Sequence, residues 1–374
     1  MSSQRSRILG NQWQNSLVRH IISKCVTCRR LRGTPSNQKM ADLPEDRMAE
    51  TPPFTYVGTD MFGPFTIKER RSELKRYGII FICLSSRAVH LESVNAMDTD
   101  SFIQCLRRFI GRRGNFRLLR CDNGTNFVGT KNELAKALSE MDEQRIKDFL
   151  LSLGADFISW KHNTPTASNQ GGVWERMIRS TRAILASLML THGQSLNDES
   201  YRTLLVEVEA TINSRPLTVD CINDPSTIQP ISPSNILTMK SSVVMPPPGH
   251  FVKEDVFCRR RWRRIQHIAN EFWSRWRKEY LSNLQSRSKW SSSKRNMAVG
   301  DVVLVRDDTN SHRNCWKLAL VQKVLESKDG HVRTVQIKQG SHSYDRPTNK
   351  LIVLVENELV QQNEIEVENE RSNK

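Results

Sequence analysis

The sequence predicts a mixed α/β fold that is followed by a smaller β-rich region. Three runs rich in aromatic and branched residues come first, at Tyr56–Phe65, Tyr77–Leu84 and Ala88–Val94. Apolar residues at helical spacing dominate after these runs, and residues 296–356 return to short apolar runs separated by Gly and polar turns. With 374 residues, the chain is long enough for two to three domains of about 100–200 residues each.

The first three runs predict three consecutive antiparallel strands, with a charged turn over Lys68–Lys75 and a second turn at Ser85–Arg87. Asp98 or Thr99 can cap the helix that follows. This helix has apolar residues at helical spacing, which are Phe102, Ile103, Leu106, Phe109 and Ile110. A fourth strand is expected at Phe116–Cys121 and a fifth at Asp156–Lys161.

Three further helical stretches complete this part of the chain. Residues 131–153 are expected to be helical in two pieces, and residues 173–192 and 197–213 form two more helices. The helix at 173–192 has one apolar face, made of Met177, Ile178, Thr181, Ile184, Leu185 and Leu188. The resulting order β-β-β-α-β-α-β-α-α predicts a mixed sheet with helices.

Composition shifts suggest where the domains begin and end. Pro-containing stretches read as linkers, and a segment with four tryptophans and twelve Lys or Arg reads as a basic helix with a packed stripe. The predicted parts are a basic N-terminal region at 1–33, a linker at 34–53, a core at 54–240, a linker and basic Trp-rich helix at 241–295, a small β-barrel at 296–356 and an acidic disordered tail at 357–374.

The charge of the chain favours a polyanionic partner. A formal net charge of +16 and a pI near 9.7 are typical of proteins that bind nucleic acid, although an acidic substrate or a membrane surface would also fit. The mean hydropathy is −0.53, and no apolar run approaches the roughly 18–20 residues that span a bilayer. The start of the chain lacks the apolar core of a signal peptide, so the eight cysteines are expected to be thiols or metal ligands.

Three acidic residues are candidates for metal binding because of where they fall. Asp60 lies within the first strand, Asp122 directly after the fourth, and Glu175 in the first turn of a helix. Together they could form an acidic cage for two divalent cations that catalyse phosphodiester chemistry. Taken singly, they also fit a solvated edge charge, a turn-forming Asp and a helix N-terminal acid.

The residues around these acids resemble a known family. The segments YVGTDMFGPF at Tyr56–Phe65, DNGTNFVG at Asp122–Gly129 and GGVWER at Gly171–Arg176 resemble the integrase core of retroelements, most closely the BEL/Pao retrotransposons. The resemblance extends to Cys25–Gly33, to Ile212–Thr218 and to the region from Arg261 through Val305. It covers nearly the whole chain from Ile8 to Leu354.

This resemblance implies a ribonuclease-H-like fold for the core and an SH3-like fold for the C-terminal barrel. It implies a polynucleotidyl transferase that binds Mg²⁺ or Mn²⁺ through Asp60, Asp122 and Glu175, trims a DNA 3′ end and joins that end to target DNA. Asp122 and Glu175 are separated by 53 positions, more than in retroviral integrases. The helical insert around Ser139–Leu153, a feature of this retrotransposon family, accounts for the extra length.

Polar residues near the acids are candidates for DNA binding. Arg179 and Arg182 follow Glu175 by four and seven positions, so the three share one helical face. Basic residues at the equivalent integrase positions clamp DNA phosphates, whereas the alternative here is a solvated surface stretch. Asn126, like Asn123, is expected either to position the substrate or to support the turn after Asp122.

The pair Cys25 and Cys28 supplies only two of the four ligands that structural zinc needs. The family completes this site with an upstream histidine pair, and His20 occupies a non-ligand position of that pattern. We therefore expect free thiols, or the incomplete remnant of a Zn²⁺ site in a truncated reading frame, rather than bound zinc. The other six cysteines are expected to be buried structural thiols.

Two classes of function remain open at this point. The first is an active integrase that works in the nucleus as a homo-oligomer on element ends and target DNA, with no membrane association. The second is a catalytically silent, truncated or domesticated DNA-binding protein derived from a retrotransposon, which the missing histidines and the unusual loop Pro165–Gln170 favour. A ribonuclease-H-type nuclease shares the core fold but leaves the barrel unexplained.

Overall fold

The computed structural model divides into two compact units, Met1–Pro44 and Glu45–Lys374, and each is described by itself. For residues 121, 159–162 and 172–176 the description covers the backbone only. The described residues are 20, 24–26, 44–121, 145, 148, 159–162, 172–219, 229–241, 245–285, 295–307, 312–327 and 329–357.

A five-stranded mixed sheet is the centre of the second unit. Its strands are β1 (Tyr56–Glu69), β2 (Ser72–Cys83), β3 (Val89–Val94), β4 (Leu118–Cys121) and β5 (Ser159–His162), in the spatial order β3-β2-β1-β4-β5. The first three strands are antiparallel to one another, while β4 is parallel to β1 and β5 is parallel to β4. The predicted mixed α/β fold with a five-stranded sheet is therefore confirmed.

The apolar run of β2 is buried on both faces of the sheet. Ile80 and Ile82 belong to the core on one face, and Ile79, Phe81 and Cys83 belong to the core on the other. Because successive side chains of a strand point to opposite faces, a continuous apolar run indicates a strand buried on both sides. The run Tyr77–Leu84 therefore fixes β2 as an inner strand.

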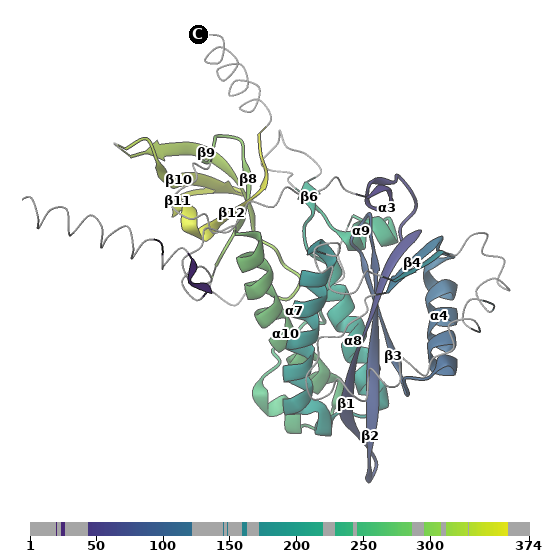
Figure 1. The fold of residues 1–374 in the computed structure, drawn as a ribbon. Coiled ribbons are helices and arrows are strands. Elements are labelled where there is room, and N and C mark those ends of the chain that lie inside the picture. Colours follow the sequence, from purple (N-terminus) through teal and green to yellow (C-terminus); the bar gives the residue numbers. More distant parts are fainter. Residues whose placement is uncertain are drawn as a thin grey trace, which may run out of the picture. The chain divides into compact units, whose positions relative to one another are not determined.

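Helices cover the two faces unequally. On one face pack α7 (Gly172–His192), α8 (Asp198–Asn213) and α10 (Arg261–Leu284), and on the other packs α4 (Thr99–Arg113), as Figure 1 shows. The apolar face predicted for α7 is buried, with Leu185 and Leu188 inaccessible to solvent. The apolar stripe of α10 belongs to the same core through Ile265, Ile268, Ala269, Phe272, Trp273 and Trp276, so this basic helix is a structural part of the α7–α8 layer. Trp262, at the start of the helix, is instead exposed.

Two details of the sheet and its first helix test the sequence predictions closely. Asp98 caps α4, accepting a hydrogen bond of 2.6 Å from the Ser101 amide, as expected. The predicted charged turn is shorter than expected, since β1 and β2 continue to the Glu69–Ser72 pair. Lys68 lies opposite Glu73, and cross-strand charge pairs of this kind stabilise a hairpin. The charged composition of this segment alone predicts a turn instead. Within the predicted helical stretch 131–153 only residues 145 and 148 are described, and both are helical. The rest of that stretch and residues 156–158 fall outside the described residues.

The C-terminal part is an all-antiparallel five-stranded sheet with the order β11-β10-β9-β8-β12. Alternate residues of these strands, such as Val303, Val321 and Ile337, form a separate small core. This agrees with the predicted SH3-like barrel. The bounds are β8 (Val302–Val305), β9 (Leu318–Glu326), β10 (Val332–Gln339), β11 (His342–Pro347), the 3₁₀ helix η4 (Thr348–Lys350) and β12 (Leu351–Val355).

Trp316, which precedes β9, packs against α10. Its ring lies 5.0 Å from that of Trp273 and 5.5 Å from that of Tyr280, and its Nε1–H donates to Ser214 Oγ at 3.2 Å. Edge-to-face aromatic pairs of this kind add stability beyond the area they bury. Short elements complete this unit: α3 (Glu45–Met48), η2 (Gly193–Ser195), β6 (Thr218–Val219), β7 (Pro230–Ile231), α9 (Pro233–Thr238) and η3 (Lys253–Phe257).

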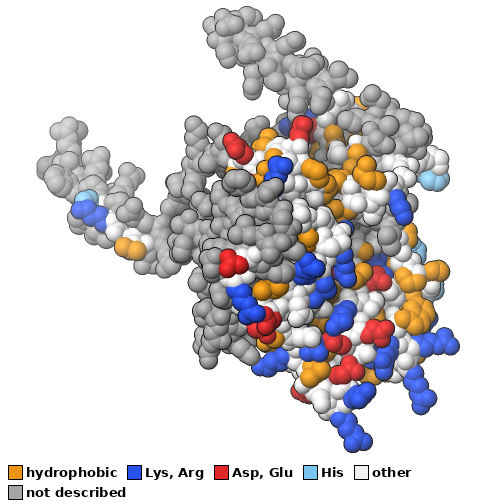
Figure 2. Space-filling view, turned by 90° about the vertical axis from the view of Figure 1, so that its right-hand side faces the viewer, with side chains coloured by type: hydrophobic (Ala, Val, Ile, Leu, Met, Phe, Trp, Pro, Cys, Tyr) orange, Lys and Arg blue, Asp and Glu red, His pale blue; other side chains and the backbone are white. Residues whose placement is uncertain are grey.

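Charge on the α4 side of the molecule is mixed. Figure 2 shows basic side chains over much of the lower half of this face, with acidic side chains between them. Among the helices described, none is long and apolar enough to cross a membrane.

Candidate active site

Asp60 lies in the middle of β1 and points toward the α7–α8–α10 layer. It pairs with Ile80 of β2, and both Ile80 and the next alternate residue of β1, Phe62, belong to the core on that face. Its carboxylate is only 11% exposed. A charge with so little access to water needs a compensating partner.

Arg182 of α7 supplies that partner. Its guanidinium Nη1 forms an ion pair with Asp60 Oδ2 and is itself only 16% exposed, while Asp60 Oδ1 accepts the Met61 amide at 2.9 Å. The pair joins residues 122 positions apart in the chain. One of the two arginines predicted to lie beside the acidic site therefore contacts one of its predicted carboxylates.

The register of β4 bears on Asp122, although Asp122 itself lies outside the described residues. The last residue of β4, Cys121, pairs with Thr59 in parallel register. Thr59 precedes Asp60, just as Cys121 precedes Asp122 in the sequence. Consecutive Cα atoms are 3.8 Å apart, so the chain leaves β4 close to Asp60.

Glu175 falls in the first turn of α7, and its side chain is outside the described part of the structure. Positions 175, 179 and 182 share a helical face at about 100° per residue. The contact between Arg182 and Asp60 shows that this face of α7 is turned toward β1. Arg179 is exposed to solvent.

The predicted metal site is therefore only partly described. No group of three or more potential ligands occurs among the residues whose side chains are described, a set that includes Asp60 but neither Asp122 nor Glu175. Carboxylate oxygens are the ligands that Mg²⁺ and Mn²⁺ prefer, and the shielded Asp60 carboxylate fits that requirement. Asn126 also lies outside the described residues.

Of the predicted zinc-site region in the first unit, the structure describes His20 and Cys25. Cys25 is half-buried, while Cys28 lies outside the described residues. His20 is exposed. The zinc prediction stays a prediction.

A second polar cluster, which is not among the sites predicted from the sequence, lies at the outer edge of β3. Buried His90 has Nε2 at 3.1 Å from Glu92 and Nδ1 at 3.4 Å from Glu209, with Arg113 Nε at 3.3 Å from the same Nδ1. Burial alone would lower the pKa of His90, but its hydrogen bonds to Glu209 and Glu92 outweigh this, so the pKa lies above its ordinary value. The sequence signal is a pair of titratable residues, His90 and Glu92, at alternate positions of a short strand that also contains Val89, Leu91 and Val94.

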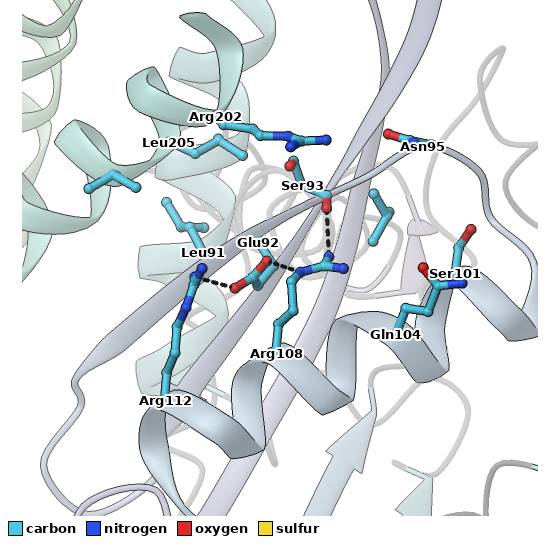
Figure 3. A pocket seen from close by; sticks show the side chains of 12 residues that line it. Leu91, Glu92, Ser93, Asn95, Ser101, Gln104, Arg108, Arg112, Arg202 and Leu205 are labelled. Carbon is cyan, nitrogen blue, oxygen red and sulfur yellow. Dashed lines mark hydrogen bonds and ion pairs between the residues drawn. The ribbon is translucent and has the colours of Figure 1, made fainter. Parts of the chain in front are cut away.

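This cluster borders a pocket of about 280 Å³ between β3, α4 and α8. Figure 3 shows Glu92 at its wall, held by Arg108 and Arg112 of α4. Burial would raise the pKa of Glu92, but hydrogen bonds from His90 and Arg108 outweigh it and hold that pKa below its usual range. The ion pairs of Arg108 and Arg112 with Glu92 tie α4 to the edge strand β3, away from Asp60 on β1.

Comparisons with known proteins add the following. Residues 260–354 match the model of a family of unknown function, DUF5641. No curated protein sequence matches the chain significantly.

Among solved structures, a chain of the simian T-cell lymphotropic virus intasome in complex with PP2A regulatory subunit B56 gamma is 13% identical, with a TM-score of 0.36 and coverage of 91% of each chain. The catalytic core domain of BIV integrase is 16% identical, with a TM-score of 0.30 and coverage of 50% of this chain and 95% of that one. Similarities of this size carry no information about chemistry, which has to come from the residues themselves.

Proposed function

We propose that this chain is an integrase of the BEL/Pao retrotransposon type, a polynucleotidyl transferase that uses Mg²⁺ or Mn²⁺ to process DNA 3′ ends and join them to target DNA. The observation that carries the proposal is the convergence on Asp60. The Arg182 ion pair turns the face of α7 that bears position 175 toward Asp60, and β4 ends at Cys121, in register with Thr59 next to Asp60.

Asp60, Asp122 and Glu175 are the residues that would hold the metal. When bound, two such ions activate the attacking oxygen and stabilise the leaving oxygen of an in-line displacement. The chain's own contribution is rigidity: Asp60 is fixed within a strand paired on both sides, and Glu175 within the first turn of a long helix.

The arginines of α7 would hold the DNA. Arg179 is exposed and free to meet phosphates, while Arg182 is held by Asp60 in the structure. A cation at Asp60 would compete with the guanidinium of Arg182, which would then turn to a phosphate of the incoming strand. We infer from this that metal binding and DNA binding favour each other.

An integrase function would also define the partners, the oligomeric form and the location of this protein. The partners would be element ends and target DNA, the working form a homo-oligomer, and the location the nucleus. The net charge of +16 supports a nucleic-acid partner.

The decisive experiment is strand transfer of a labelled DNA end into a plasmid with Mg²⁺ or Mn²⁺. The parent protein should be active and Asp122→Asn inactive, because that change removes a metal-binding charge and keeps the side-chain shape. Asp100→Asn, at an exposed position of α4, is the matched control and should keep full activity. Inactivity of the parent with intact, salt-sensitive DNA binding would instead support a catalytically silent DNA-binding protein.

A further inference from the structure

An exposed cluster of aromatic rings and arginines lies where η3 passes into α10. It consists of Phe251, Phe257, Trp262 and the arginines at 259, 260 and 261, and is called the aromatic–arginine patch below. Phe257 is 84% exposed and Trp262 is 47% exposed, which is unusual for such large apolar side chains. The three arginines are exposed too.

The patch is held in shape by Arg263. Its guanidinium lies 5.2 Å from the centre of the Phe251 ring and 5.7 Å from that of Trp262, and the two rings meet edge to face at 5.7 Å. Arg263 is anchored in turn by Asp255, at 2.7 Å from Nε to Oδ1, and donates to the His250 carbonyl at 2.8 Å. Asp255 also accepts the Val252 amide at 2.9 Å. Two of the three rings, those of Phe251 and Trp262, are thus positioned before any ligand arrives.

The charge of the patch is uncompensated. Asp255 is used by Arg263, and the first turn of α10 contains no acidic residue. Within the described part of the chain, none of the three arginines at 259–261 has an ion-pair partner. The ligand should therefore be anionic.

We propose that the aromatic–arginine patch binds single-stranded nucleic acid. Guanidinium groups pair with phosphates, and exposed rings stack on bases, a combination typical of surfaces that hold single strands without regard to sequence. In a duplex the bases already stack on one another, so an exposed ring gains little there. A membrane fits less well, because the apolar stripe of α10 is buried in the core and only isolated rings face outward.

The patch is distinct from the acidic site. Arg264 donates to the carbonyls of Cys258 and Ser195, which ties the start of α10 to the residues just after α7. Arg182, which contacts Asp60, lies thirteen positions before Ser195. At 1.5 Å per helical residue this separates the two sites by roughly 15–20 Å along α7. The inference is independent of catalysis at Asp60.

The test is fluorescence anisotropy of the full chain with a labelled oligo(dT) strand and with a duplex of the same length, in EDTA so that the acidic site holds no metal. Phe257→Ala combined with Trp262→Ala should weaken binding to the single strand by at least about fivefold, with little effect on the duplex. Leu190→Ala, at an exposed apolar position of α7, is the control and should change neither affinity.

A charge variant tests the arginines separately. Arg259→Gln combined with Arg260→Gln should weaken single-strand binding. The slope of log K against log salt concentration should become shallower by about 1.4, which corresponds to two lost phosphate contacts. Arg70→Gln combined with Arg71→Gln removes the same charge from the exposed β1–β2 turn and should have a smaller effect. The arginine and Leu190 variants should melt at the parent temperature, since their altered side chains are exposed. The aromatic variant should stay folded and lose only a small part of its stability, because Trp262 is half exposed.

Three results would overturn the proposal. The first is an aromatic variant that binds oligo(dT) within twofold of the parent. The second is a turn variant that loses as much affinity as the patch variant. The third is an aromatic variant that loses binding to phosphatidylserine–phosphatidylcholine vesicles but not to oligo(dT).

Discussion

The ion pair between Asp60 and Arg182 is the residue-scale feature on which the proposed chemistry depends. Both side chains are largely buried, and the ion pair compensates two charges that have little access to water. A divalent cation at Asp60 would replace the guanidinium as the compensating charge. The ion pair therefore links the stability of the metal-free protein to the binding of metal at Asp60 and of DNA by Arg182.

Arg182→Gln should destabilise the metal-free protein by about 1–3 kcal/mol, because Asp60 loses a charged hydrogen-bond donor in a poorly solvated position. Millimolar Mg²⁺ should recover part of this loss. Urea unfolding with and without Mg²⁺ measures both effects. Arg179→Gln, exposed on the same helix, is the matched control, and equal stability of the two variants in EDTA would contradict the role given to Arg182.

His90 should give the fold a pH dependence. Its pKa is raised in the folded state, so its contribution to stability is present below the unfolded value of about 6.5 and is lost as pH rises through the higher folded pKa. The free energy of unfolding should thus fall from near pH 6 upward, and less so in His90→Gln. Urea titrations across this range, with the exposed His331→Gln as control, measure it, and parallel pH profiles for parent and His90→Gln would refute the assignment.

At the scale of elements, the sequence predicts strands, helix faces and caps, which depend on neighbouring residues, but not contacts between residues far apart in the chain. Strand β2 and the apolar face of α7 follow from periodicity, and Asp98 from capping chemistry. The length of the β1–β2 hairpin does not follow, because Lys68 and Glu73 read as turn residues until they are seen opposite each other. The contact between Asp60 and Arg182 spans 122 positions and has no local signal.

The place of α10 shows the same limit. The tryptophan stripe predicts that one face of this helix is buried, but periodicity does not say against what. In the structure, Trp273 and Trp276 enter the core that α7 and α8 share with the sheet. Domain boundaries drawn from composition at 241–295 stay predictions, since composition separates basic from apolar stretches and says nothing of docking.

Trp276→Ala should therefore cost about 3–5 kcal/mol of unfolding free energy, the usual range for a fully buried Trp. Trp276 is 1% exposed, whereas Trp262 on the same helix is half exposed. Trp262→Ala should accordingly cost much less. Urea unfolding followed by circular dichroism compares the two, and similar losses would mean that α10 is not part of this core.

At the scale of the whole molecule, charge is the property that the sequence states most directly. The excess of 56 basic over 40 acidic residues gives a positive field that attracts polyanions over long range. Part of this positive charge is neutralised within the protein, as in Arg108 and Arg112, which form ion pairs with Glu92. Exposed arginines that stay available include Arg179 on α7 and the three arginines of the aromatic–arginine patch.

Duplex DNA affinity should therefore depend steeply on salt. An increase from about 50 to 200 mM NaCl should weaken binding roughly a hundredfold, the loss expected when about four phosphates are neutralised. Anisotropy titrations in EDTA measure this slope without catalysis. A loss of less than about tenfold would show that the net charge is not used for duplex binding.

The central claim is that Asp60, Asp122 and Glu175 share one cation site, and direct Mn²⁺ binding tests it most simply. Electron paramagnetic resonance of the full chain titrated with Mn²⁺ should show bound ions that are lost or weakened in each of Asp60→Asn, Asp122→Asn and Glu175→Gln. Asp100→Asn should bind as the parent does. Bound Mn²⁺ that survives all three substitutions, or a parent that binds none, would contradict the account.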